Sequence, residues 1–167
     1  MAAEWTMVTV ESIAGKVASG PFGSNLRGSE YVVAGVPVIR GGNLSGPRFN
    51  EQDYVYVTDS KADQLSSSIA YPMDVVFAAR GTVGAVGIVP QGRHPRYLLS
   101  SNLVKVTVDP NKADPSFVFY YFRSRQGQNE IMAHVNTTGV PKIERALESL
   151  RGFTLPRPPV KEQQAIA

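Results

Sequence analysis

Basic and polar side chains recur in short, glycine-flanked loops of this sequence, and the chemistry open to them is contact with nucleic acid. Arginine can bind guanine through two hydrogen bonds, asparagine can bind adenine in the same way, and serine and threonine reach phosphates. A local interpretation is also open, in which the asparagines hold turns and the arginines that end apolar strands make structural contacts. The candidate DNA-contacting residues are Ser24, Asn25, Arg27, Arg40, Asn43, Arg80, Thr82, Arg93, His94, Arg96, Thr138 and Lys142.

The distribution of charge favours the same chemistry. The chain has 17 basic and 14 acidic residues, a formal net charge of +3, and no acidic residue lies between Asp74 and Asp109. A segment with one sign of charge suits a phosphate backbone, because each neutralised phosphate releases counterions. A basic surface loop without a partner is the alternative that charge alone leaves open. The basic residues of this segment are Arg80, Arg93, His94, Arg96 and Lys105.

Residues suited to catalysis or metal binding are few. The chain has two histidines, His94 and His134, and no cysteine. Neither histidine stands beside a nucleophile in the sequence, and no cluster of ligands has metal-binding spacing. The glycine-rich loop 20–25 lacks the Gly-Lys-Ser/Thr ending of a phosphate-binding loop. We therefore expect no catalytic residues, no metal and no cofactor in this chain.

Length and composition predict one domain of a cytoplasmic protein. A chain of 167 residues can bury a substantial core. The absence of cysteine excludes a disulfide scaffold and fits a reducing compartment. No apolar run approaches the roughly 20 residues that a membrane helix needs, so we expect no membrane partner.

Apolar runs predict the strands that position these loops. The predicted strands are 36–39, 54–57, 74–78, 84–90 and 98–108, with a further alternation at Val8 and Val10 that leads into a helical turn. Thr58 and Asp59 can cap a short helix through Leu65, and Asp114-Pro115 can begin a buried helix over about 114–134. Residues 142–150 suit a second short helix or a turn. Because no regular βαβ alternation is present, we predict an α+β fold with a mixed, mostly antiparallel β-sheet and a few helices.

The end of the chain predicts a further helix. A strand-like stretch over 153–157 runs into Pro158 and Pro159, and a helix start follows over 160–167. So short a helix is marginal alone. We expect that it either continues into a longer helix or docks on another element.

Six segments of the chain carry a family resemblance. They read GVPVIRGGNL at 35–44, DVVFAARGTVG at 74–84, SNL at 101–103, FYYF at 119–122, TGVPKI at 138–143 and LPRPPVKEQQAIA at 155–167. In this order and spacing they resemble one target recognition domain of a type I restriction–modification specificity subunit. The resemblance covers nearly the whole chain, and the final segment is its strongest part.

The resemblance implies how this chain is divided into parts and which subunits it binds. Residues 1–157 would form the target recognition domain, and 158–167 would begin the long spacer helix. A complete specificity subunit carries two such domains, each of which reads half of a bipartite double-stranded DNA target. Its partners are the methyltransferase (modification) subunit and the restriction subunit, and S-adenosylmethionine, ATP and Mg are expected only there. This chain has one domain, so a second half-subunit joined through the C-terminal helix is a further implied partner.

The family's base-contacting residues vary between its members, so the resemblance does not assign them. We predict that the loops 24–27 and 93–96 read bases, and that Arg80, Thr82 and Thr138 lie nearer the DNA backbone. Two alternatives remain. The chain could be the recognition domain of a fused restriction–methylation enzyme, or a protein-interaction module whose aromatic run and final helix bind a partner without DNA.

Overall fold

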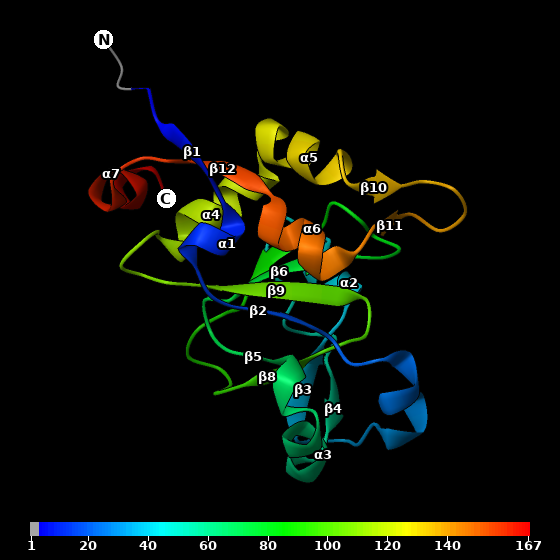
Figure 1. The fold of residues 1–167 in the computed structure, drawn as a ribbon. Coiled ribbons are helices and arrows are strands. Elements are labelled where there is room, and N and C mark those ends of the chain that lie inside the picture. The colour runs from blue at the N-terminus through cyan, green and yellow to red at the C-terminus, as the bar shows by residue number, and fades with distance from the viewer. Residues whose placement is uncertain (1–3) are drawn as a thin grey trace.

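The computed structural model describes residues 4–167 and shows a strand-rich middle of the chain, with helices before and after it (Figure 1). The first three residues of the expected domain 1–157 lie outside the described residues. The strands are β1 Thr6–Thr9, β2 Ala14–Ser19, β3 Val36–Ile39, β4 Val55–Val57, β5 Ile69–Ala70, β6 Val75–Ala78, β7 Val86–Ile88, β8 Tyr97–Leu99, β9 Leu103–Val108, β10 Val135–Asn136, β11 Lys142–Ile143 and β12 Thr154–Arg157. The α-helices are α1 Val10–Ile13, α2 Gly41–Leu44, α3 Asp59–Gln64, α4 Pro115–Arg123, α5 Arg125–Met132, α6 Ala146–Gly152 and α7 Val160–Ile166, and the 3₁₀ turns are η1 Gly23–Asn25, η2 Gly28–Glu30 and η3 Ser66–Ser68.

Two four-stranded sheets form the centre of the fold. Their strand orders are β2-β9-β6-β7 and β4-β3-β8-β5, and the pairs β1-β12 and β10-β11 form two smaller sheets. Within the described chain, the pairing of β3 with β8 is parallel and the other strand pairs are antiparallel. The prediction of an α+β fold with a mixed, mostly antiparallel sheet is therefore confirmed.

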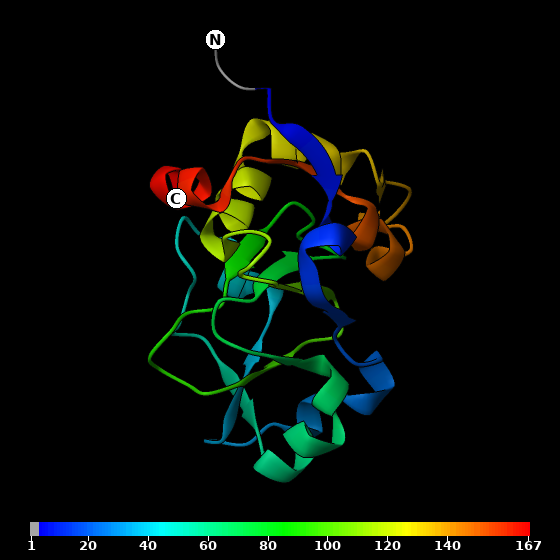
Figure 2. The same ribbon diagram turned by 60° about the vertical axis from the view of Figure 1, so that its left-hand side comes forward.

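The core is layered because side chains alternate along β6. Val75 and Phe77 belong to an apolar cluster that includes residues of α1, α4 and α6. Val76 and Ala78 belong to a second cluster, which fills the space toward Leu99 of the other sheet. A third cluster covers the far side of β3 and β8 beneath α3. Figure 2 shows the result from another side, with α4, α5 and α6 gathered at one end of the molecule and α3 at the other.

A buried ion pair connects β9 to the start of β6. Lys105 Nζ lies 2.6 Å from Asp74 Oδ2, and both side chains are almost fully buried. Thr107 Oγ1 donates to Asp74 Oδ1 at 2.7 Å, and the Tyr71 N–H donates to Asp74 Oδ2 at 2.8 Å. Because buried charges are stable only when paired and hydrogen-bonded, this network fixes the register of the two strands against the turn before β6.

The N-terminal strands differ from the prediction. Val10 begins α1 instead of continuing an alternating strand, because Thr9 Oγ1 accepts a hydrogen bond from the Ser12 N–H and caps the turn. The following strand, β2, was not predicted. Its sequence, AGKVAS, is poor in β-branched and aromatic residues, and it is held by pairing with β9 across a register shift at Gly15.

The predicted long helix over 114–134 is two helices. Asp114 caps α4 as expected, with its Oδ1 accepting from the Phe117 N–H at 3.0 Å. The helix stops at Ser124, whose backbone is extended and whose Oγ accepts from the Gly127 N–H to cap α5. A Cβ at Gly127 would lie 2.1 Å from the Tyr121 carbonyl oxygen, so the close packing of α5 on α4 requires glycine.

Residues 142–150 also form two elements. Lys142 and Ile143 pair with β10 as the short strand β11, and α6 begins only at Ala146. The predicted strand over 98–108 is likewise divided into β8 and β9, because a turn over 100–102 sends the chain from one sheet to the other. Predicted strand 84–90 is confirmed in its central part as β7.

The C-terminal helix α7 docks on the start of α4. The Asp114 N–H donates to Gln163 Oε1 at 2.8 Å, and Gln163 Nε2 donates to the Pro158 carbonyl oxygen at 2.7 Å. The Gln163 side chain is fully buried by these contacts. Among residues 4–167, no helix combines the length and apolar character that crossing a membrane demands.

Candidate nucleic-acid interface

The loop after β6 lies beside the segment before β11. The Gly81 N–H donates to the Pro141 carbonyl oxygen at 2.9 Å, and the Ile143 N–H donates to the Ala79 carbonyl oxygen at 2.8 Å. Arg80 and Lys142 therefore face each other across an antiparallel bridge. Both side chains are exposed, and two residues of the candidate set that are 62 positions apart become neighbours.

The loop after β3 lies beside Arg80 and Lys142, because its Gly41 packs against Thr82 of the loop after β6. A Cβ at Gly41 would lie 2.7 Å from Thr82 Oγ1, so glycine permits the close approach. Arg40 is exposed, and its Nη2 donates to the Asp53 carbonyl oxygen at 2.9 Å. The guanidinium is thus oriented by a neutral acceptor and keeps its charge available at the surface.

The turn over 100–102 connects these loops to the glycine-rich loop after β2. The Ala79 N–H donates to the Asn102 carbonyl oxygen at 2.8 Å, and the Gly20 N–H donates to the Leu103 carbonyl oxygen at 2.8 Å. A Cβ at Gly20 would lie only 1.8 Å from the Ser100 carbonyl oxygen. The loop that carries Ser24 and Asn25 is therefore held tightly against the turn.

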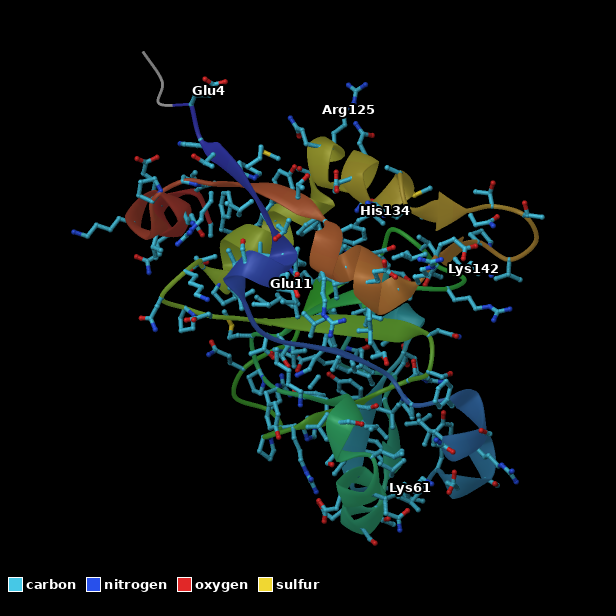
Figure 3. All side chains as sticks on the ribbon, in the orientation of Figure 1. Glu4, Glu11, Lys61, Arg125, His134 and Lys142 are labelled. Atoms are coloured by element: carbon cyan, nitrogen blue, oxygen red, sulfur yellow. The ribbon has the colours of Figure 1, made fainter. Side chains whose placement is uncertain are left out.

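Five segments consequently form one surface, which we call the loop cluster: residues 20–27, 40–44, 79–84, 100–102 and 137–142. Figure 1 shows η1 and the β10–β11 connection along the same side of the molecule, and Figure 3 shows Lys142 there. The side chains of Ser24, Asn25 and Arg80 are exposed and make no hydrogen bond or ion pair within the described part of the chain. They are free to bind a ligand.

Local contacts occupy the side chain of one candidate in the loop cluster and the backbone N–H of another. Asn43 is 2% exposed, its Oδ1 accepts from the Arg40 N–H at 2.7 Å, and its Nδ2 donates to the Asn50 carbonyl oxygen at 2.8 Å. Asn43 therefore positions Arg40. The Arg27 N–H donates to Glu30 at 2.8 Å, and this bond together with Lys61 lowers the pKa of the Glu30 carboxyl. The Arg27 side chain itself remains exposed.

The remaining candidates, in the segment 93–96, are held by a different part of the protein. The Arg96 guanidinium donates to Asp63 at 2.7 Å and to Asp59 at 3.0 Å, and these carboxylates of α3 raise its pKa. The His94 ring packs edge-on against Tyr97, with 5.5 Å between the ring centroids. Arg93 is exposed. Arg93 is thus the member of this segment whose charge is free for a phosphate.

Sequence reasoning missed two residues at this surface. Phe22 is 82% exposed at the tip of the glycine-rich loop. Arg123 of α4 donates to the carbonyl oxygens of Pro47 and Gly46 at 3.1 and 3.2 Å, which ties the segment after α2 to the helical end of the molecule. The signal for Phe22 was its place between proline and glycine, where the chain turns and a large side chain has little to pack against.

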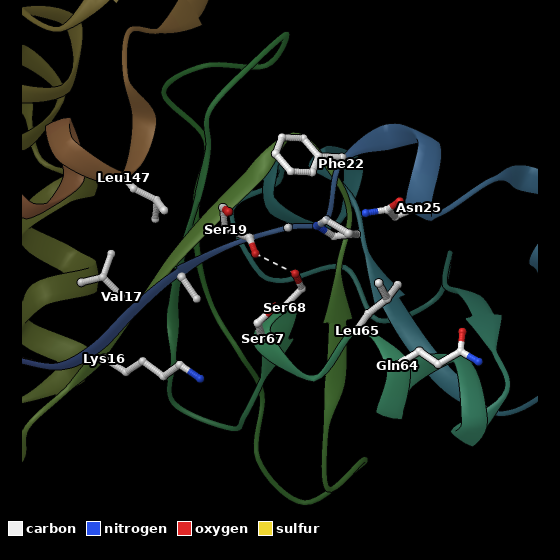
Figure 4. Close-up of a pocket in the computed structure, with 13 residues that line it drawn as sticks. Lys16, Val17, Ser19, Phe22, Asn25, Gln64, Leu65, Ser67, Ser68 and Leu147 are labelled. Carbon is white, nitrogen blue, oxygen red and sulfur yellow. Dashed lines mark hydrogen bonds between the residues drawn. The ribbon is translucent and has the colours of Figure 1, made fainter.

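A hollow of about 520 Å³ opens beside the glycine-rich loop. Figure 4 shows Phe22 and Asn25 on one side of it, with Gln64 and Lys16 around the rest of its edge. Ser68 Oγ donates to the Ser19 carbonyl oxygen at 2.8 Å and closes its floor. Its polar lining is of hydroxyl and amide groups with the Lys16 ammonium group at the edge, which suits hydrogen bonding to a ligand.

The two histidines take part in packing. His134 Nε2 lies 3.7 Å from Glu130 on α5, and its ring packs on Phe153. In the described residues, no three His, Cys, Asp or Glu side chains gather closely enough to hold a metal ion.

The family model of the type I restriction modification DNA specificity domain matches residues 3–167. The chain belongs to this family. The search of curated proteins returned no match to this specificity domain.

Solved structures share the fold of this specificity domain at low sequence identity. A type I restriction-modification S subunit from M. genitalium superposes with a TM-score of 0.66 at 19% identity, covering 98% of this chain and 37% of that one. The HsdS subunit from Thermoanaerobacter tengcongensis gives 0.65 at 17% identity, with 99% and 36% covered. The type IIG restriction endonuclease BpuSI gives 0.62 at 11% identity, with 96% and 25% covered. The chain thus spans little more than a third of the S subunits it matches.

Proposed function

We propose that this chain recognises double-stranded DNA in a sequence-specific manner, as the specificity component of a type I restriction–modification system. It would read one half of a bipartite target and direct methyltransferase and restriction subunits to it, without catalysis of its own. The observation that carries the proposal is the match of the specificity-domain family to residues 3–167. In this proposal, 158–167 begin the spacer helix, and S-adenosylmethionine, ATP and Mg belong to the partners.

The loop cluster is the proposed DNA-contacting surface. Arg40 and Arg80 supply exposed positive charge within it, which suits phosphates, and Lys142 adds an exposed ammonium group whose Nζ lies 3.6 Å from the exposed Glu144 carboxylate. Ser24 and Asn25 supply free polar side chains, which suit base edges or phosphates. Thr82 and Thr138 are exposed in the same cluster. We place Arg93 at its margin and assign Arg96 to the structure, since two carboxylates already bind its guanidinium.

A longer restriction enzyme is a second candidate context. The similarity of fold to the type IIG restriction endonuclease BpuSI supports it, because there the matching region is a quarter of the chain. The sequence of the gene on both sides of this chain distinguishes the two contexts. DNA recognition by the loop cluster is common to both.

Selection from a randomised duplex pool at two salt concentrations tests the proposed function. We expect enrichment of a short, non-palindromic sequence of a few base pairs, with binding that weakens as salt rises. Binding to protein partners with no affinity for DNA at either salt concentration would support the protein-interaction alternative instead.

An Arg80→Ala variant tests the proposed surface. Removal of one phosphate contact should lower the slope of log K against log salt by about 0.9. Arg125→Ala is the matched control, since Arg125 is also exposed but lies on α5, away from Lys142 in Figure 3. Equal slopes for the two variants would remove Arg80 from the interface.

A further inference from the structure

Phe22 stands out among the exposed side chains of the loop cluster. The residue is 82% exposed, and among the large apolar residues of the described chain only Val33, at 97%, is more exposed. An exposed aromatic ring leaves its favourable burial energy unused in the free protein. Such a residue at a binding surface is a candidate to be buried by the ligand.

The loop around Phe22 is held rigidly on both sides of the ring. Pro21 before it and Leu26 after it are buried, and Gly20 packs against the Ser100 carbonyl. The Asn25 N–H donates to the Phe22 carbonyl oxygen at 2.8 Å and closes the turn η1. The ring is thus presented by a fixed backbone, so its insertion into a ligand costs little loop ordering.

The neighbours of Phe22 indicate the chemistry of that ligand. Ser24 and Asn25 follow the ring with free polar side chains, and a Cβ at Gly23 would lie 3.9 Å from Ser101 Oγ. The basic residues Arg80 and Lys142 lie on the same loop cluster. An aromatic face beside amide, hydroxyl and cationic groups matches a nucleobase within a phosphate backbone better than an apolar protein surface.

We propose that Phe22 contacts a DNA base directly, by packing its ring on a base at one step of the half-site. This inference rests on the proposed function and deepens it, since it assigns a specificity-determining residue. Apolar side chains contact the thymine methyl group and enter partly unstacked base steps, and aromatic rings stack on base faces. Asn25 would then read an edge of the same base pair or of its neighbour.

A comparison of Phe22→Ala with Phe22→Trp on the selected half-site tests this proposal. Loss of stacking on one base should weaken binding by about 5- to 150-fold, while Trp should retain most of the affinity. The slope of log K against log salt should be unchanged, because no charge is removed. Replacement of each base pair in turn should show that Phe22→Ala has lost discrimination at one position only.

Val33→Ala is the matched control. Val33 is exposed but lies in the connection before β3, next to the Val32 N–H that is bonded to Tyr56 of β4, and the variant should bind as the parent does. Equal unfolding midpoints of all three variants would show that the fold is intact.

Affinity of Phe22→Ala within twofold of the parent, with unchanged discrimination at every base pair, would overturn the assignment of Phe22 while leaving DNA recognition in place. A parent protein without DNA affinity would instead overturn the proposed function, and the assignment with it.

Discussion

Lys105 and Asp74 show what single residues contribute to this fold. Their ion pair of 2.6 Å lies buried at the junction of β9 with the turn before β6. Substitution of Lys105 by Met leaves the Asp74 carboxylate buried with only the Tyr71 N–H and Thr107 as donors. We expect this change to lower the free energy of unfolding by about 3–5 kcal/mol, measured by urea titration.

The exposed pair Arg145 and Glu148, 3.6 Å apart, provides the comparison for that measurement. Glu148→Ala should cost no more than about 1 kcal/mol, because solvent screens the pair and its side chains gain freedom when it breaks. A similar cost for both substitutions would show that the buried pair does not hold the two strands together.

Tyr54 should make the free energy of unfolding depend on pH in the alkaline range. Burial raises the pKa of Tyr54 above its ordinary value of 10.0, and Tyr97 beside it adds to the effect. A folded-state pKa above the unfolded one stabilises the protein below pH 10, and this contribution is lost as pH rises beyond 10. The free energy of unfolding should therefore fall between pH 10 and 11.5, and less steeply in Tyr54→Phe. Urea midpoints across this range measure both slopes, and parallel slopes would contradict the assignment.

At the scale of elements, the sequence predicted those whose signal is local. The buried strands β3 and β6 follow from the apolar runs VPVI and VVFA, and the start of α4 follows from the Asp114-Pro115 pair. The division of the helix at Ser124 was not predicted, because the aromatic run before it and the polar run after it both tolerate helix. Whether this segment forms one continuous helix or two is decided by the packing of α5 back on α4, which is a tertiary contact.

The candidate site shows the same limit. The sequence indicated the polar loops, and Arg40, Arg80 and Lys142 do meet on one surface. It could not indicate that Asp59 and Asp63 of α3 would bind Arg96, since those residues are more than 30 positions away. The place of Phe22 between Pro21 and Gly23 indicates a turn, but the exposure of its side chain depends on how Pro21 and Leu26 pack around it, which the sequence does not show.

Gly127 permits a test at this scale. A Cβ there would lie 2.1 Å from a backbone oxygen of Tyr121 and 2.4 Å from the Phe122 Cα, so Gly127→Ala must push α5 away from α4. We expect a loss of about 1–3 kcal/mol or more in the free energy of unfolding. Gly152→Ala in α6 meets nothing within 4 Å and should be neutral or stabilising by about 0.4–1 kcal/mol. Thermal unfolding of both variants measures the difference, and equal midpoints would refute the close packing.

At the scale of the whole molecule, this chain is much shorter than the S subunits that it matches. The chain spans 37% of the M. genitalium S subunit. A single module that reads a few base pairs has limited affinity, because few contacts contribute above the non-specific background. In our proposal, bipartite recognition therefore needs a second module held at a fixed distance.

Two copies of this chain joined by a short Gly-Ser linker after residue 167 should reproduce that requirement. On a duplex with two inverted half-sites, the second binding event becomes intramolecular, and we expect affinity about 10²- to 10⁴-fold above that of the single chain. Insertion of about five base pairs between the half-sites rotates one of them to the other face of the duplex and should abolish most of the gain. Titration of both duplexes by fluorescence anisotropy measures the two effects. A gain in affinity that ignores the spacing would mean that the linked copies bind through charge alone, and that the loop cluster does not fix the orientation of the domain on DNA.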